Sequence, residues 1–296
     1  MNKLKNIFAL CILSVFAFAC SDSNTTPTIE AFDHEAQALI DKDSLSTFFT
    51  KHYYDTAVDS VKSLVPGATP LSEDANLKIM NVTENEIDYD LYYYVASAQD
   101  IGTPIIDKGF PTPVDSVFVK YEGFRIYGTD SITPRFEIRE IPIWFTLNAV
   151  IRGWSYGFTN FKNGDNVTDN GPITFENGGK GILFIPSGLA YRNSGTTGSI
   201  RSNENLIFYI RLYDFVKDTD HDNDGIPSWL EDPDGDGDPR NDDTNGDFFV
   251  NYLDADDDGD GVLTKDEDAN GDGNPANDFS DPNNPTLADY LNPDIN

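Results

Sequence analysis

Cysteine is almost absent from this sequence. The 296 residues contain two cysteines, Cys11 and Cys20, and both lie within the first 20 positions. Cys11 falls inside the apolar stretch 7–19, and Cys20 follows this stretch directly. The chain after Cys20 therefore cannot contain a disulfide, a thiol nucleophile or a zinc site with cysteine ligands.

Basic residues are also scarce. The chain has 20 Lys and Arg residues against 51 Asp and Glu residues, which gives a formal net charge of −31. Nucleic-acid binding depends on cationic side chains that neutralise phosphates, so this composition excludes that class of partner. The imbalance is greatest in residues 217–296, which hold 25 of the acids, three bases and 19 apolar residues. This segment cannot build an ordinary apolar core, so it is either disordered or ordered by something else.

The N-terminal apolar run is short. It covers residues 7–19, whereas a membrane-spanning helix needs about 20 apolar residues, and we therefore predict a signal peptide over 1–19. The sequence Ala-Phe-Ala-Cys at 17–20 resembles a bacterial lipobox. This resemblance implies lipidation of Cys20 and attachment to the outer membrane, on its periplasmic or surface face. The alternative is a plain signal peptide cleaved nearby. The following Ser-Asp pair resembles the surface-export signal of Bacteroidetes lipoproteins.

Residues 20–87 are predicted to form a tether and an N-terminal helical extension. Residues 30–55 have helical character, and Asp43 or Ser44 can cap a helix there. One face of this helix would carry Leu45, Phe48, Phe49 and His52, at the spacing i, i+3, i+4 and i+7. We expect this face to dock on the domain that follows.

Residues 88–216 are predicted to form an α+β domain. Stretches typical of strands occur at 88–98, 116–121, 136–147, 181–185 and 206–212. Between them, residues 149–162 have the apolar spacing of a helix. This order predicts an antiparallel sheet packed on one short helix.

Four separated motifs lie in this region. They are Val-x-Val-x-Tyr-x-Gly at 117–123, Val-Ile-Arg-Gly-Trp at 150–154, Ile-Pro-Ser-Gly-Leu-Ala-Tyr at 185–191 and Asn-Leu-Ile-Phe at 205–208. Together and in this order they resemble FKBP-type peptidyl-prolyl cis-trans isomerases, over about residues 88–215. The resemblance implies an FKBP-like fold, proline-containing polypeptide clients and catalysis without a cofactor.

The resemblance also implies which residues form the binding pocket. Trp154 would be its floor, and Tyr191 would donate a hydroxyl hydrogen bond from a loop over the pocket. Val150 and Ile151 would offer backbone groups to the peptide. The walls would be Tyr121, Ile151, Ile200 and Phe208.

The sequence departs from the family pattern near this pocket, and two of the departures concern the aromatic–acid pair and the residue after the tyrosine. The family usually has a Phe-Asp pair after the first strand. Here the pair is either Phe136-Glu137, or it is missing and Asp130-Ser131 is its remnant. Arg192 stands where a glycine is usual after the tyrosine. These changes leave the expected fold intact and leave the catalytic rate open.

The chemistry of prolyl isomerisation suits a pocket of this kind. The barrier of ~18–20 kcal/mol arises because the amide loses resonance when it is twisted. No bond is broken, so a catalyst needs an apolar site that holds the proline ring and favours the twisted amide. One or two hydrogen-bond donors for the carbonyl complete the requirement.

The acidic segment 217–296 contains a repeat. The pattern Asp-x-Asp-x-Asp-Gly, followed by an aliphatic residue, begins at Asp220 and again at Asp256, an offset of 36 residues. A third copy of the spacing begins at Asp243, with Phe248 in place of the glycine. Alternate carboxylates, a sharp turn and a closing acid at position 12 are typical of calcium-binding loops. The loops leave no room for intervening helices, an arrangement that resembles thrombospondin type-3 calcium repeats.

We predict structural calcium sites in this segment, residues 217–296. The ligand sets are Asp220, Asp222, Asp224 and Glu231; Asp243, Asn245, Asp247 and Asp254; and Asp256, Asp258, Asp260 and Glu267. Zinc is disfavoured because the segment has one histidine and no cysteine. In this interpretation the ions replace a core, with apolar residues such as Ile226, Leu230 and Phe249 as small plugs. The alternative is a solvated acidic tail.

These predictions together describe a lipid-anchored peptidyl-prolyl cis-trans isomerase that assists the folding of exported proteins at the cell envelope. The rival interpretation is a non-catalytic chaperone module that uses the same pocket to hold peptides, carried on a calcium-rigidified stalk. Retention of Trp154, Tyr191 and Phe208 favours the enzyme. The altered carboxylate position and Arg192 favour the rival.

Overall fold

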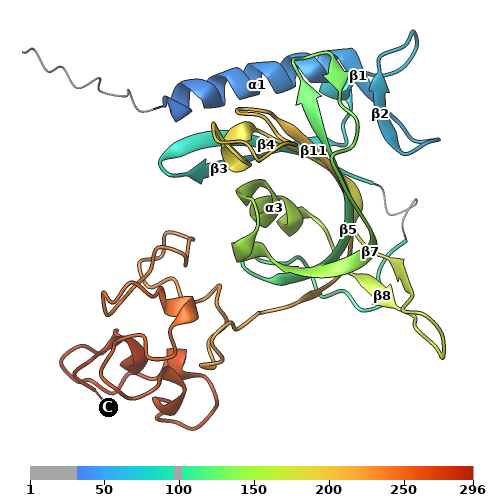
Figure 1. Cartoon of the computed structure of the whole chain (residues 1–296). Helices are drawn as coiled ribbons and strands as arrows, with labels where there is room; N and C mark the ends of the chain where they lie inside the picture. Colours follow the sequence, from blue (N-terminus) through green and yellow to red (C-terminus); the bar gives the residue numbers. More distant parts are fainter. Residues whose placement is uncertain (1–31, 97–101, 296) are drawn as a thin grey trace, which may run out of the picture. The chain divides into compact units, whose positions relative to one another are not determined.

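The computed structural model describes residues 32–96 and 102–295 (Figure 1). Its helices are α1 (His34–Lys51) and α3 (Arg152–Gly157). The strands are β1 (His52–Asp55), β2 (Ser60–Ser63), β3 (Leu77–Glu84), β4 (Ile87–Val95), β5 (Ser116–Tyr127), β6 (Ser131–Ile132), β7 (Glu137–Thr146), β8 (Gly164–Asn166), β9 (Phe175–Asn177), β10 (Lys180–Ile185) and β11 (Leu206–Val216). The 3-10 turns are η1 (Leu71–Glu73), η2 (Leu147–Ala149), η3 (Phe158–Asn160), η4 (Ser187–Leu189), η5 (Asn251–Leu253), η6 (Thr264–Asp266), η7 (Pro275–Asn277) and η8 (Asp289–Leu291).

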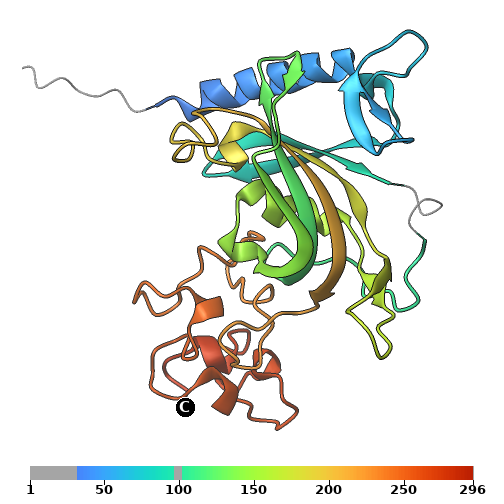
Figure 2. The same cartoon turned by 45° about the vertical axis from the view of Figure 1, so that its right-hand side comes forward.

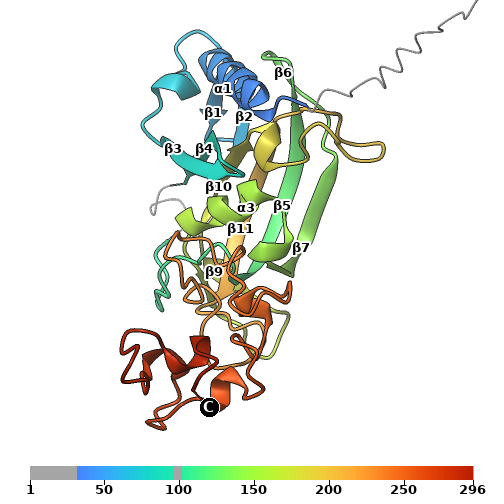
Figure 3. The ribbon, with the colours of Figure 1, turned by 90° about the vertical axis from the view of Figure 1, so that its left-hand side faces the viewer.

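An antiparallel sheet of seven strands forms the centre of the fold. Its order is β3-β4-β10-β11-β5-β6, and β7 also pairs with β5. Each strand stretch predicted from the sequence overlaps a strand of this sheet, and the predicted helix corresponds to α3 and η3. The sheet curves around α3, while α1 crosses its other face (Figure 2, Figure 3). The predicted α+β class, with an antiparallel sheet on a short helix, is confirmed.

The alternation of side chains along the strands divides the apolar core into two layers. In β10, Leu183 and Ile185 belong to the cluster that contains the α3 side chains. Ile182 and Phe184 belong to the cluster that contains the α1 side chains. Because successive side chains of a strand point to opposite faces, this one strand supports both helices.

Helix α1 docks on the sheet through the face that its apolar spacing predicts. Leu45, Phe48 and Phe49 are between 0% and 2% exposed and pack with side chains of β4 and β10. The Phe49 ring contacts Tyr92 and Phe184 in edge-to-face geometry, with centroid distances of 4.8 and 5.0 Å. The predicted docking of this helix face is therefore confirmed.

The start of α1 differs from the prediction. The N-cap, Asp33, lies ten residues before Asp43 and eleven before Ser44, and both of these residues lie in the helix interior. Asp33 is the N-cap instead, and its side chain accepts a hydrogen bond from the Ala36 N–H at 2.8 Å. An aspartate at this position satisfies an amide that has no partner within the helix.

Among the described residues of the extension predicted over 20–87, the helical elements are α1 and the short 3-10 turn η1. After α1 the chain forms the β1–β2 hairpin and then β3, which pairs with β4 from Leu77–Tyr94 to Glu84–Ile87. Asn85 and Glu86 link these strands with φ angles of 52° and 64°, the left-handed conformation of a two-residue hairpin turn. A domain boundary at residue 88 would therefore separate two strands of one sheet.

The acidic segment has little regular structure. Among its described residues the only helical elements are the 3-10 turns η5 to η8, and none is a strand. One small apolar cluster is built on Ile226, Ala288 and Tyr290. Ile226 is 0% exposed, as expected of an apolar plug, whereas Leu230 and Phe249 are 63% and 62% exposed, so the expectation is wrong for these two. Buried carboxylates outnumber buried apolar side chains in this segment.

The N-terminal predictions lie outside the described residues. They are the signal peptide over 1–19 and the lipidated Cys20, and the structure therefore does not test them. Within the ranges 32–96 and 102–295, no helix combines the length and the apolar character needed to cross a bilayer.

The docking of α1 leads to a stability prediction. Phe49→Ala should lower the free energy of unfolding by about 3–5 kcal/mol, because it leaves a cavity between the helix and the sheet. Leu39→Ala, on the same helix but 67% exposed, should change it by about 0.5 kcal/mol or less. Urea unfolding followed by circular dichroism measures both. Equal effects of the two substitutions would contradict the docking.

Candidate functional site

A cavity of about 580 Å³ opens beside α3 on the concave side of the sheet. This volume is within the range of about 300–1,000 Å³ that is usual for ligand sites. The lining residues are Tyr121, Glu137, Phe145, Ala149, Val150, Ile151, Arg152, Trp154, Ala190, Tyr191 and Phe208. Six of the seven pocket residues predicted from the sequence are among them.

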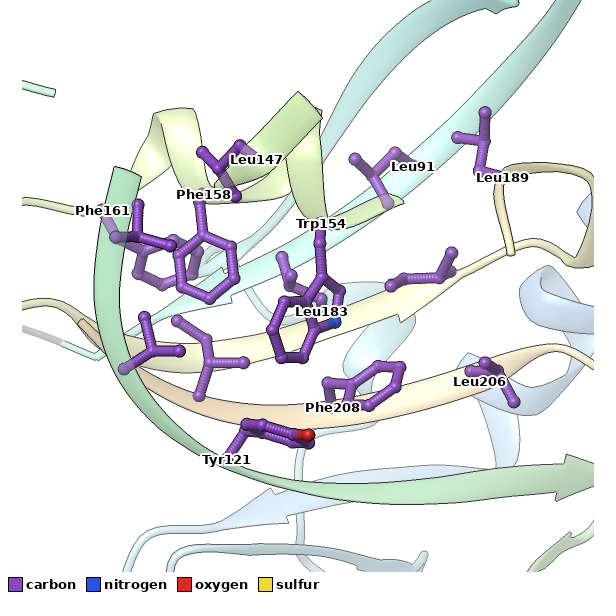
Figure 4. Packing of buried hydrophobic residues seen from close by; sticks show 14 of the residues in the cluster. Leu91, Tyr121, Leu147, Trp154, Phe158, Phe161, Leu183, Leu189, Leu206 and Phe208 are labelled. Atoms are coloured by element: carbon purple, nitrogen blue, oxygen red, sulfur yellow. The ribbon is translucent and has the colours of Figure 1, made fainter. Parts of the chain in front are cut away.

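Aromatic rings surround Trp154 in this cavity (Figure 4). The Trp154 ring meets Tyr121 and Phe208 edge-to-face, with centroid distances of 4.7 and 5.2 Å. Phe145 and Phe158 make similar contacts at 5.6 and 5.3 Å. Interlocked edge-to-face rings hold one another in position and leave an apolar surface. The buried indole N–H of Trp154 has no acceptor among the described residues.

Two glycines place Trp154 at this position. Gly153 and Gly157 lie on the side of α3 that faces β10. A side chain at Gly157 would come within 2.7 Å of Leu183, and one at Gly153 would overlap Ile185. The backbone of α3 can therefore lie directly on β10 only because these two residues have no Cβ.

One carboxylate lines the cavity, and its position shows which of the two candidate residue pairs lies beside the pocket. Glu137 lines the cavity and accepts a hydrogen bond from the Tyr121 hydroxyl at 2.8 Å. The preceding Phe136 packs edge-to-face on Phe208 at 5.7 Å. Asp130 instead pairs with Lys51 at 2.5 Å, at an exposed position. The Phe136-Glu137 pair, and not Asp130-Ser131, is thus the aromatic–acid pair at the cavity.

Tyr191 lies on the loop that follows η4 and is half-buried. Its hydroxyl donates to no other described residue, and burial together with the nearby Glu137 raises the pKa of Tyr191. The hydroxyl therefore stays protonated at neutral pH and can donate to a ligand. Hydrogen bonds to α1 hold this loop in place. The Asp41 carboxylate accepts one from the Ser187 N–H at 2.8 Å and one from the Ser187 hydroxyl at 2.6 Å. Asp41 is 1% exposed, and this burial raises the pKa of its carboxyl.

Ile200 differs from the other predicted pocket residues. It is 4% exposed and packs in the inner core, and it is not among the residues that line the cavity. Its loop folds back on itself, because the Thr196 N–H donates to the Ile200 carbonyl at 2.8 Å. This hydrogen bond fixes the loop conformation in which the Ile200 side chain is buried. Its predicted role as a pocket wall is therefore not supported by the geometry.

The acidic segment forms five copies of one turn. In each copy the first residue is an aspartate whose side chain accepts the backbone N–H of the sixth residue. The first residues are Asp220, Asp232, Asp243, Asp256 and Asp268. The sixth residues have φ angles between 80° and 103°, and one of them, Phe248, is not a glycine. We number these turns loop 1 to loop 5 in chain order.

The three aspartates in each of the predicted ligand sets of loops 1 and 4 converge. Carboxylate oxygens of Asp220, Asp222 and Asp224 lie within 4.8 Å of one another, as do those of Asp256, Asp258 and Asp260. In loop 3, which begins at Asp243, the Asn245 amide donates to Asp254 at 3.0 Å and its oxygen accepts the Asp247 N–H at 2.8 Å.

Loop 2 was missed as a ligand set. Its residues Asp232, Asp234 and Asp236 form a further group of converging carboxylates. Loop 5 has the same turn, with Asn270 between Asp268 and Asp272. Both loops carry the Asp-x-Asx-x-Asp-Gly spacing, so the sequence contained the signal that could have identified them.

The closing acids of loops 1 and 4 are buried without partners. Glu231 is 0% and Glu267 is 7% exposed, and neither oxygen of either side chain has a hydrogen-bond partner. Burial, followed by repulsion from neighbouring carboxylates, raises the pKa of Glu231 to about 10 and that of Glu267 to about 8. Buried carboxylates of this kind are stable only when protonated or beside a cation. Their oxygen-only surroundings suit Ca²⁺.

Two parts of the chain match known protein families. Residues 107–213 match the family of FKBP-type peptidyl-prolyl cis-trans isomerases, and residues 221–293 match a family described as BamM C-terminal. The first match contains all the residues that line the cavity. The second covers loops 2 to 5 and all of loop 1 except Asp220.

Individual proteins show the same likeness. A probable FKBP-type peptidyl-prolyl cis-trans isomerase FkpA of Neisseria meningitidis is 34% identical over 34% of this chain and 32% of its own length. FK506-binding protein 1 of Candida albicans is 31% identical over 35% of this chain and 81% of its own length. A crystal structure of a peptidyl-prolyl isomerase from Pseudomonas syringae covers 63% of this chain and 98% of its own, at 19% identity and a TM-score of 0.38. The chain spans 32% to 40% of the length of the first bacterial relatives.

Proposed function

This chain belongs to the family of FKBP-type peptidyl-prolyl cis-trans isomerases, and we propose that it isomerises Xaa-Pro bonds in exported polypeptides at the cell envelope. The observation that supports this most strongly is the aromatic cavity at α3. Tyr121 of β5, Trp154 of α3 and Phe208 of β11 meet there, together with Val150, Ile151 and Tyr191. Four segments that are far apart in the sequence contribute these side chains.

The cavity offers the two things that the reaction requires. A proline ring placed on Trp154, between Tyr121 and Phe208, would be held by apolar contacts in a site that excludes water. A twisted amide has less charge separation than a planar one, so such a site binds it better than the planar ground state. No bond forms or breaks, and the residues need not transfer a proton.

Hydrogen-bond donors lie at the edge of this apolar site. The Tyr191 hydroxyl is free to donate to a peptide carbonyl. The Ile151 carbonyl already accepts a hydrogen bond from the Trp154 N–H at 2.8 Å, so the Ile151 N–H and the Val150 backbone would be the groups offered to a peptide. Glu137 would act as a positioning residue, because its hydrogen bond orients the Tyr121 ring against Trp154.

The rival function, a non-catalytic chaperone module, shares this cavity. One reason for it was the uncertain carboxylate, and Glu137 now supplies a carboxylate beside Tyr121. Arg192 remains a departure: its φ of 51° lies in the left-handed region that favours glycine, the residue usual in the family at this position. An isomerase assay separates the two functions.

The catalytic proposal predicts a graded loss of activity. Tyr191→Phe removes one hydrogen bond of about 0.5–1.5 kcal/mol, so kcat/KM for a Xaa-Pro peptide should fall about two- to tenfold. Phe208→Ala removes a wall and should lower it further. Tyr127→Phe, at a tyrosine that is 60% exposed, is the matched control and should have no effect. The rate of cis-trans exchange of the Xaa-Pro bond, measured by NMR or by a protease-coupled assay, tests this prediction. A folded wild-type chain that leaves the uncatalysed rate unchanged would favour the chaperone function.

We also propose that a lipid on Cys20 anchors the chain to a membrane of the envelope. The support is the short apolar run over residues 7–19 and the position of Cys20 directly after it. The polar stretch that follows would act as a tether between the anchor and α1.

The anchor proposal predicts the behaviour of the two cysteines. Cys20→Ala should move the protein from the membrane fraction to the soluble fraction, because the only acylation site is lost. Cys11→Ala, inside the segment that would be removed, should leave it in the membrane fraction. Mass spectrometry of the N-terminal peptide checks for the lipid. The anchor would be ruled out if the Cys20→Ala variant stayed in the membrane fraction and the wild-type N-terminal peptide carried no lipid.

We further propose that the acidic segment binds structural calcium. The support is the convergence of carboxylates in loops 1, 2 and 4 and the buried, unpaired acids Glu231 and Glu267. With 25 acids and 19 apolar residues in residues 217–296, cation binding would supply the stabilisation that apolar burial cannot. Bound ions would make the segment a rigid unit rather than a solvated tail.

The calcium proposal predicts selective unfolding. A chelator such as EGTA should make the chain cleavable by protease after about residue 218, since the uncompensated carboxylates then repel one another. The α+β domain has its own apolar core and should remain resistant and active. Limited proteolysis with mass identification of the fragments measures this. Equal cleavage with and without calcium would show that calcium does not order the segment.

A further inference from the structure

We propose that the cation site of loop 1 is completed by Asp257 of loop 4, so that one cation joins two repeats. This inference rests on the proposed calcium binding and extends it to a residue that the loop spacing excludes. Residue 257 falls between the ligand positions Asp256 and Asp258 of its own loop. The sequence pattern therefore assigns it no role in binding.

The geometry places Asp257 in the other loop. Carboxylate oxygens of Asp224, Glu231 and Asp257 lie within 4.8 Å of one another. The three side chains are 1%, 0% and 1% exposed, which makes them the most deeply buried acids of the segment. Asp224 and Glu231 are predicted ligands of loop 1, so Asp257 enters that site from a distant part of the chain.

Unpaired oxygen atoms line this group. Both oxygens of Glu231, one oxygen of Asp224 and one oxygen of Asp257 are buried without a hydrogen-bond partner. The second oxygen of Asp224 accepts the Ile226 N–H at 2.8 Å, and the second oxygen of Asp257 accepts the Thr264 hydroxyl at 2.9 Å. In both Asp224 and Asp257, one carboxylate oxygen accepts a hydrogen bond that fixes the side chain, and the other oxygen is free to bind an ion.

No basic side chain compensates these charges. Among the ion pairs of the described residues, none joins a Lys or Arg to Asp224, Glu231 or Asp257. Three buried carboxylates in contact cannot all be ionised without a cation. Asp222 of loop 1 adds another buried, unpaired oxygen. An all-oxygen set of this charge favours a hard cation such as Ca²⁺ over Zn²⁺.

The repeat itself explains why residue 257 points away from its own loop. In loops 1 and 4 the second and ninth residues are hydrogen-bonded: the Asp257 N–H donates to the Thr264 hydroxyl at 3.2 Å, and the His221 N–H donates to the Ser228 hydroxyl at 3.1 Å. In both loops this pairing turns the second residue toward the interior of the segment. Loop 1 has a histidine there, whereas loop 4 has an acid that reaches the site of loop 1.

Terbium luminescence can report on loop 1 selectively. Trp229 is the tenth residue of loop 1, and Tb³⁺ bound nearby is sensitised by tryptophan. Titration of the full chain in detergent with Tb³⁺, with Trp229→Phe to identify the signal, gives the affinity of this site. Isothermal titration with Ca²⁺ gives the number of sites.

The matched pair of variants is Asp257→Asn and Asp266→Asn. Both remove one negative charge from loop 4, but Asp266 is exposed. Asp257→Asn should weaken the Trp229-reported site by about tenfold or more, because a ligand is lost. Asp266→Asn should weaken it by about twofold or less, because an exposed charge is screened. Calcium titration of Asp257→Asn should show the loss of one site, with the others retained.

Three results would overturn the inference. Asp257→Asn that binds Tb³⁺ as tightly as the wild type would show that the residue is no ligand. Equal weakening by both variants, or loss of every calcium site in Asp257→Asn, would assign the effect to net charge or to misfolding. A wild-type chain that binds neither Tb³⁺ nor Ca²⁺ would refute the proposed calcium binding itself. That result differs from a wild-type chain that binds both ions but does not use Asp257 as a ligand.

Discussion

The direct contact between α3 and β10 is the constraint on which the cavity depends. Gly153 and Gly157 allow the helix backbone to lie against Leu183 and Ile185, and this approach lowers Trp154 into the concave face of the sheet. The rings of β5 and β11 can then close around it. A residue with a Cβ at either glycine would lift the helix and separate Trp154 from its neighbours.

Strand β10 also connects the cavity to α1, which packs on its opposite face. The opposite face of β10 carries Ile182 and Phe184, on which α1 docks. From that position Asp41 of α1 holds the Ser187 backbone and hydroxyl, and the chain continues from there to Tyr191. The N-terminal helix is therefore part of the support of the site, although it lies on the other side of the sheet.

The acidic segment is organised on a different physical principle. In the α+β domain, folding is driven by apolar burial, and its buried polar groups are largely paired. In the acidic segment buried carboxylates outnumber buried apolar side chains, and carboxylate oxygens converge in several groups. One turn is repeated five times, and in each copy the first aspartate accepts a hydrogen bond from the backbone N–H of the sixth residue. This turn brings the carboxylate oxygens of each loop together. Such a segment can be stable only if cations or protons compensate its charge.

The sequence by itself determined the strands around the cavity, helix α3 and the repeated acidic turn, because these depend on local spacing. Alternation along the strands, the motif around Trp154 and the Asp-x-Asp-x-Asp-Gly turns all act within a few residues. Only the tertiary structure decided which distant residues meet. It selected Glu137 over Asp130 as the acid beside Tyr121, excluded Ile200 from the cavity lining and brought Asp257 to Glu231. These outcomes depend on how elements far apart in the chain pack together, and no local spacing encodes that packing.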